Sequence, residues 1–81
     1  MTTTHALLAD LDAAGVFTDL PMSDGELLVA ALSFDFCFRR SDPARSMRSR
    51  ASAVRAGRWP CEDRAGVAQA LDLAASIVAV M

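Results

Sequence analysis

Arginine gives this sequence its most distinctive chemistry. Seven of its eight arginines lie between Arg39 and Trp59, whereas residues 1–38 contain six acidic residues and neither Arg nor Lys. A guanidinium group can form paired hydrogen bonds with a carboxylate or a phosphate. The complete absence of Lys fits that kind of recognition, but it also fits a GC-rich genome, which is the simpler explanation. The arginine-rich segment is thus the first candidate for a binding surface.

The other residues with versatile chemistry do not form a catalytic or metal-binding pattern. His5, Cys37 and Cys61 lack the C-x-x-C and H-x-x-x-H spacings of metal sites. The sequence also lacks G-x-S-x-G, H-E-x-x-H and the phosphate-binding loop G-x-x-x-x-G-K-[ST]. We interpret His5 as an exposed residue at the start of a helix. We therefore expect no enzymatic activity, no metal and no cofactor.

Length and composition favour one small domain. The chain has 81 residues, of which 53% are hydrophobic, and many of these are Ala, which favours helices. The N-terminal residues lack the basic and apolar regions of a signal peptide, so we expect a cytoplasmic protein with reduced cysteines. Ala65–Met81 is apolar, but it is shorter than about 20 residues and keeps a polar stripe, so we expect no membrane span.

Capping signals define two expected helices in the acidic part. The first covers about residues 5–14, with an apolar side that includes Leu7, Leu8 and Leu11, and Gly15 is placed to close it. The second covers about residues 24–40. Its expected start is a capping box of Ser23 and Glu26, with a hydrophobic staple between Met22 and Leu27, and the helix dipole accounts for Asp24 in the first turn.

Two more helices are expected in the rest of the chain. Asp42 and Pro43 start the third, about residues 43–56, and Gly57 ends it. The fourth covers about residues 60–80, with Glu62 and Asp63 in its first turn. The connections have the lengths normal for helix bundles. The sequence therefore predicts an all-α fold, a compact four-helix bundle-like single domain.

Residues 33–39 allow two interpretations. Phe34, Phe36 and Phe38 alternate with polar or small residues, which is the period of a half-buried strand. We favour a helix because no partner strand is recognisable. In a helix, Asp35 falls among apolar positions and is expected to pair with Arg39; the alternative is a carboxylate that acts as an acid or base.

The second expected helix is apolar on nearly all sides. Such a helix belongs in the centre of a bundle or in an oligomer interface. A chain of this size has little other surface with which to cover it. We therefore predict a homodimer, with Phe34, Phe36 and Phe38 as the expected contacts.

The third expected helix is amphipathic. Its narrow apolar stripe is flanked by a ridge of Arg45, Arg48 and Arg55, whereas Arg50 points elsewhere. The ridge either contacts an acidic partner or is a solvated face balanced by the protein's own acids. The stripe consists of Ala44, Met47, Ala51 and Val54. The predicted partner-binding residues are Arg45, Arg48, Arg50, Arg55 and Arg58.

These features predict a non-enzymatic protein-binding module. We expect an inhibitor or regulator that covers a surface on a larger machine, such as one that handles nucleic acids. The size and charge profile resembles that of many phage-encoded proteins that block host machinery, including anti-CRISPR proteins. The alternative is a DNA- or RNA-binding regulator whose third helix binds phosphates while Trp59 stacks on a base. The pI of about 5.1 and the lack of a helix-turn-helix turn weigh against this alternative.

Overall fold

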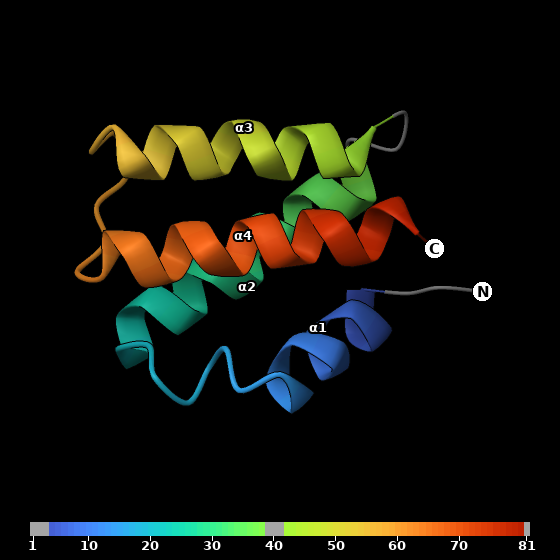
Figure 1. The fold of residues 1–81 in the computed structure, drawn as a ribbon, viewed down its shortest axis with the longest axis horizontal. Coiled ribbons are helices and arrows are strands. Elements are labelled where there is room, and N and C mark those ends of the chain that lie inside the picture. Colours follow the sequence, from blue (N-terminus) through green and yellow to red (C-terminus); the bar gives the residue numbers. More distant parts are fainter. Residues whose placement is uncertain (1–3, 39–41, 81) are drawn as a thin grey trace.

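A computed structural model describes residues 4–38 and 42–80, without the side chains of residues 4 and 36–38. In these ranges the chain forms four helices, and no segment is a strand. The helices are α1 (Thr4–Ala13), α2 (Met22–Phe38), α3 (Pro43–Arg55) and α4 (Arg64–Ala79) (Figure 1). The prediction of an all-α fold is confirmed, and the helical interpretation holds for residues 33–38.

Helices α2 and α4 organise the packing, because each of them contacts the other three helices. Helices α3 and α4 lie side by side and run antiparallel, while α1 lies on the other side of α4 (Figure 1). Both the arginine-rich helix and the acidic N-terminal part of the chain thus pack against α4. Helices α1 and α3 consequently lie on different sides of α4, whereas α2 contacts both of them.

The core contains the apolar faces that the sequence predicts. All four residues of the α3 stripe are buried. Many of the core residues of α3 and α4 are Ala, and small side chains let neighbouring helices approach closely. The buried apolar residues of the other three helices are Leu7 and Leu11 in α1, Leu28, Ala31 and Leu32 in α2, and Val67, Ala68, Ala70, Leu71, Ala74 and Ala75 in α4.

Two glycines end helices as predicted. Gly15 and Gly57 have positive φ angles of 81° and 77°, a backbone conformation that glycine adopts without strain. After α1, the N–H of Val16 bonds to the carbonyl of Leu11 at 3.2 Å; after α3, Arg58 makes the equivalent bond to a carbonyl five residues back. These bonds define Schellman motifs, which turn the chain sharply toward the next segment.

The expected start of α2 is wrong in its details. The helix begins at Met22, two residues earlier than predicted, and Ser23 lies inside its first turn. The Ser23 hydroxyl donates to Glu62 Oε2 at 3.1 Å instead of forming a capping box with Glu26. Met22 is 81% exposed, so it does not form the expected staple with Leu27. The Ser23 side chain therefore bonds the first turn of α2 to Glu62, in the segment before α4, and not to Glu26 of its own helix.

The fourth helix also begins later than predicted. Asp63 is its N-cap and accepts a hydrogen bond from the Gly66 N–H at 3.0 Å, so α4 starts at Arg64 rather than near residue 60. A backbone bond from the Cys61 N–H to the Trp59 carbonyl marks a turn before it. Residues 58–63 thus form a connecting segment that lies against α2.

Candidate functional site

The arginines of α3 and of the segment after it differ in whether they are paired within the fold. Arg50 lies inward: its Nε and Nη2 atoms donate to the two carboxylate oxygens of Asp35 at 2.8 and 2.5 Å. Asp35 is fully buried, and the Arg50 side chain is 21% exposed. The guanidinium group also lies over the Trp59 ring, 4.7 Å from its centre. Arg50 is therefore mainly a structural contact between α2, α3 and the following segment.

This contact changes the expectation for Asp35. Its partner is Arg50 of α3, whereas the expected partner Arg39 lies outside the described residues. Because both carboxylate oxygens accept from one guanidinium group, the side chain is held in a fixed position. The buried Asp35 carboxylate is thus paired with a charged guanidinium group. A recess of about 290 Å³ adjoins it, lined by Asp35, Ser46, Ser49, Arg50, Ala53 and Trp59.

Arg55 forms an ion pair with another helix. Its Nη2 atom lies 2.6 Å from Asp72 Oδ2 of α4, and the two side chains are 50% and 43% exposed. A pair this exposed contributes little to stability, about 1 kcal/mol at most. It nevertheless supplies a counter-charge for one member of the predicted ridge. Of the two interpretations of the ridge, Arg55 thus fits the second, in which the protein's own acids balance the charge.

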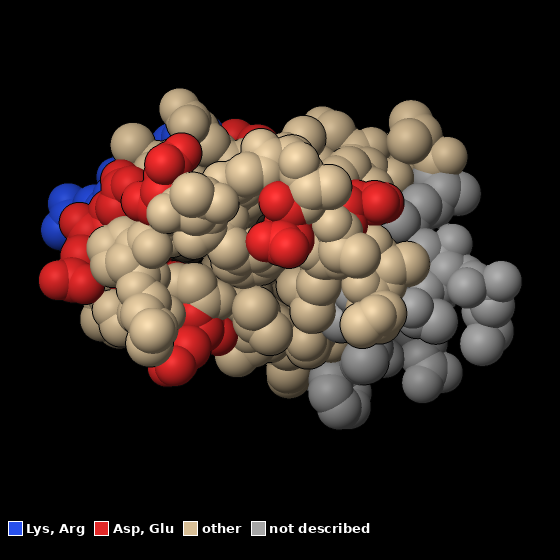
Figure 2. All heavy atoms as spheres, turned by 90° about the horizontal axis from the view of Figure 1, so that it is seen from below, with Lys and Arg blue, Asp and Glu red and all other residues tan. Residues whose placement is uncertain are grey.

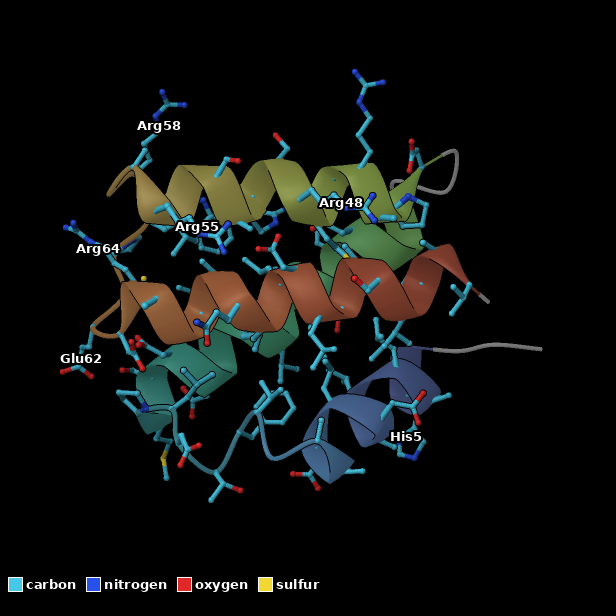
Figure 3. The ribbon with its side chains drawn as sticks, viewed as in Figure 1. His5, Arg48, Arg55, Arg58, Glu62 and Arg64 are labelled. Carbon is cyan, nitrogen blue, oxygen red and sulfur yellow. The ribbon has the colours of Figure 1, made fainter. Side chains whose placement is uncertain are left out.

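Three arginines extend from the arginine-rich side without an ion pair among the described residues. These outward arginines are Arg45, Arg48 and Arg58, and all three are exposed. Figure 3 shows Arg58 pointing away from the helices. Arg45 lies in the first turn of α3, where the helix dipole disfavours a cation, and Arg48 follows one turn later. The outward arginines are thus the part of the predicted set that remains open to a partner.

Asp24 is a buried residue whose role the sequence analysis missed. It is 1% exposed, although it lies in the first turn of α2. Its Oδ1 atom accepts from the Glu62 N–H at 2.9 Å, and its Oδ2 atom accepts from the Asp63 N–H at 2.7 Å. Asp24 therefore joins α2 to the segment that precedes α4. Asp24 is separated from Glu62 by 38 positions in the sequence and from Asp63 by 39, so no local pattern reveals these contacts.

Cys61 lies next to this contact and is half-buried. Burial raises the pKa of its thiol, and the negative charge of Asp24 raises the pKa further. A raised pKa lowers the thiolate fraction, which disfavours a role as nucleophile at neutral pH. Within the described ranges, no group of three or more His, Cys, Asp or Glu residues is placed to hold a metal ion.

An apolar groove lies between α2 and the segment that connects it to α1. Its volume is about 720 Å³, and it is open to solvent. The groove could not be predicted from the sequence, because it depends on how residues 15–21 fold against α2. The only signal was the apolar character of that connection. The groove is lined by Phe17, Leu20, Pro21, Met22, Gly25, Glu26, Val29 and Ala30.

The predicted dimer contacts are only partly described. Phe34 is 46% exposed, and the side chains of Phe36 and Phe38 lie outside the described residues. In the described part of the chain, no helix is both long and apolar enough to cross a membrane.

Comparison with models of protein families found no match, and comparisons with curated proteins and with solved structures found none either. The functional interpretation therefore depends on the residues and geometry of this chain.

Proposed function

We propose that this protein is a non-enzymatic protein-binding module whose outward arginines contact an acidic surface on a partner. The observation that supports this most is the division of the arginines. Arg50 and Arg55 are paired within the fold, whereas Arg45, Arg48 and Arg58 are exposed and in no ion pair among the described residues. Neighbouring cations repel one another, so an acidic partner would relieve this repulsion.

Size and charge favour a particular form of this function. A small protein-binding module can act by occupying a surface, and it can thereby inhibit or regulate a larger machine. The phage-type inhibitor expected from the sequence profile is one example. Arg is suited to such contacts, because its guanidinium group can bond a carboxylate with two parallel hydrogen bonds.

Nucleic-acid binding is less well supported by the geometry. The sequence alternative used Trp59 to stack on a base, but one face of this ring is occupied by Arg50. The outward arginines are few, and the chain as a whole carries a net charge of −2. Phosphate binding weakens steeply as salt rises, so titration with random duplex and single-stranded oligonucleotides at low and higher salt distinguishes the two functions. We expect no binding with that salt dependence.

The double change Arg45→Glu with Arg48→Glu tests the proposed contact. We expect it to remove the partner from a pull-down with lysate of the native host. The melting temperature should stay equal or rise, because the change removes repulsion and places an acid near the positive end of the α3 dipole, a gain of up to about 1 kcal/mol. A destabilised variant that still captures the partner would refute the contact.

Two control variants separate charge from geometry. Arg45→Lys with Arg48→Lys keeps both charges but removes paired hydrogen bonding, so partner loss in this variant would indicate recognition by guanidinium groups. Arg55→Glu makes the same reversal on the same helix, but it places a carboxylate beside Asp72. We expect Arg55→Glu to lower the melting temperature, unlike the reversal of the outward arginines.

A further inference from the structure

The apolar groove is a second surface, distinct from the outward arginines. Its walls come from α2 and from the connection before it, and most of the lining side chains are apolar. Met22 lies at the groove and is 81% exposed, which is unusual for a large apolar side chain. Open apolar concavities of this volume are typical sites for the anchor residues of a bound segment.

The surroundings of the groove are acidic. Glu26 is part of its lining, Asp19 precedes the lining residue Leu20 in the chain, and both are exposed. Glu62 is held near the start of α2 by the Ser23 hydroxyl. Figure 2 shows the side of the molecule that carries α1 and the following connection: acidic atoms are spread over it, and among the described residues basic atoms appear at one edge of the view.

We propose that this groove binds a partner segment that combines bulky apolar side chains with Arg or Lys. The apolar side chains would fill the groove, and the basic side chains would meet the acidic surroundings. Complementary charge speeds the encounter and excludes acidic competitors. The inference does not depend on the proposed function, because the two surfaces have opposite charge and share no residue.

A second copy of this chain fits the groove less well. Two grooves that face each other would bring Glu26 and Asp19 of one copy close to the same acids of the other. The arginine-rich side of a second copy has the right charge, but it lacks an apolar anchor. Among the described residues, the exposed large apolar side chains belong to α2, to α4 and to Val80, not to α3. A separate basic and apolar partner is therefore the better occupant.

Selection from displayed random peptides of about 12 residues tests this proposal. The full-length protein is immobilised, and one enriched peptide is synthesised with a fluorescent label for anisotropy titration. We expect enriched sequences to combine large apolar residues with Arg or Lys. Higher salt should weaken their binding, since part of the attraction is between exposed charges.

Matched variants locate the bound peptide. Ala30→Gln places a longer polar side chain in the groove wall and should weaken binding by at least about tenfold. Ala79→Gln makes the same change at an exposed Ala at the far end of α4 and should leave the affinity unchanged. Glu26→Gln should weaken binding by about two- to fivefold, as expected for an exposed ion pair. Met22→Ser is a second groove variant at an exposed position.

Several outcomes would overturn the proposal. These are a lack of enrichment, enrichment of acidic peptides, or equal effects of Ala30→Gln and Ala79→Gln on affinity. Self-association of the wild-type protein that Ala30→Gln abolishes would instead assign the groove to a second copy. The Arg45→Glu and Arg48→Glu double variant should bind the enriched peptide normally, which separates failure at the groove from failure at the outward arginines.

Discussion

At the scale of single residues, the main finding is that two buried carboxylates have hydrogen-bond partners of different kinds. Asp35 accepts hydrogen bonds from a charged guanidinium group, whereas Asp24 accepts hydrogen bonds from the backbone N–H groups of Glu62 and Asp63. A buried carboxylate without such partners would destabilise the fold strongly. Both residues therefore have a structural role, since each joins α2 to another segment of the chain.

The Asp35–Arg50 pair leads to a stability prediction. Arg50→Met leaves the Asp35 carboxylate without its partner, and we expect the free energy of unfolding to fall by about 3–5 kcal/mol. The double variant Asp35→Leu with Arg50→Met removes both charges and should recover most of this loss. Urea denaturation followed by circular dichroism measures both effects.

Arg48→Met is the control for this experiment, because Arg48 is exposed and in no ion pair among the described residues. Its substitution should change the free energy of unfolding by no more than about 0.5 kcal/mol. Similar losses in Arg48→Met and Arg50→Met would contradict the structural role of Arg50.

At the scale of helices, local signals predicted most elements but not their contacts. The α3 stripe and the closing glycines depend on spacing within one segment, so the sequence reveals them. The start of α4 was placed too early, because it depends on the capping side chain of Asp63 and on the contact of Asp24 with the preceding segment. The Asp35–Arg50 pair and the apolar groove join separate segments, and periodicity carries no information about such pairs.

Substitution by Ala is expected to have opposite effects on stability at two glycines that lie in helices. A Cβ atom at Gly66 would lie 2.4 Å from Asp63 Oδ2 and 2.9 Å from Leu20 Cδ2, so Gly66→Ala would disturb the N-cap of α4. A Cβ atom at Gly25 would meet only Phe17, at an ordinary 3.7 Å. We expect Gly66→Ala to destabilise by about 1–3 kcal/mol and Gly25→Ala to stabilise by about 0.5–1 kcal/mol. Thermal unfolding measures both effects. Changes of the same sign in the melting temperatures of the two variants would contradict this interpretation.

At the scale of the whole molecule, charge separates two surfaces. The outward arginines lie on α3 and just after it, whereas the apolar groove is lined by α2 and by the connection before that helix. The two proposed partners, one acidic and one basic, would therefore contact different residues. The sequence revealed the charge boundary at residue 39, whereas the groove depends on how the connection before α2 packs against that helix.

The predicted homodimer is also a property at this scale. Phe34 of α2 is 46% exposed, although it is a large apolar residue, and association would remove this surface from water. We expect light scattering to show a dimer at high micromolar concentration and Phe34→Ser to shift the equilibrium toward monomer. Phe17→Ser is not a suitable control because Phe17 packs against the core; Val80→Ser, at an exposed residue, is suitable. A monomer at high concentration would contradict the prediction.

The long-range contact of Asp24 has a consequence for folding kinetics. Helices α3 and α4 are antiparallel neighbours joined by a short segment, so their contacts close a small loop and can form early. The bonds of Asp24 to Glu62 and Asp63 span 38 or more residues, so we expect them to form after the contacts between α3 and α4. We expect Asp24→Asn to accelerate unfolding while leaving the refolding rate nearly unchanged, with Asp10→Asn as the exposed control. In stopped-flow measurements, a slowed refolding limb would instead place this contact in the folding nucleus. If the contact forms late, Asp24 governs how long the native state persists rather than how fast it is reached.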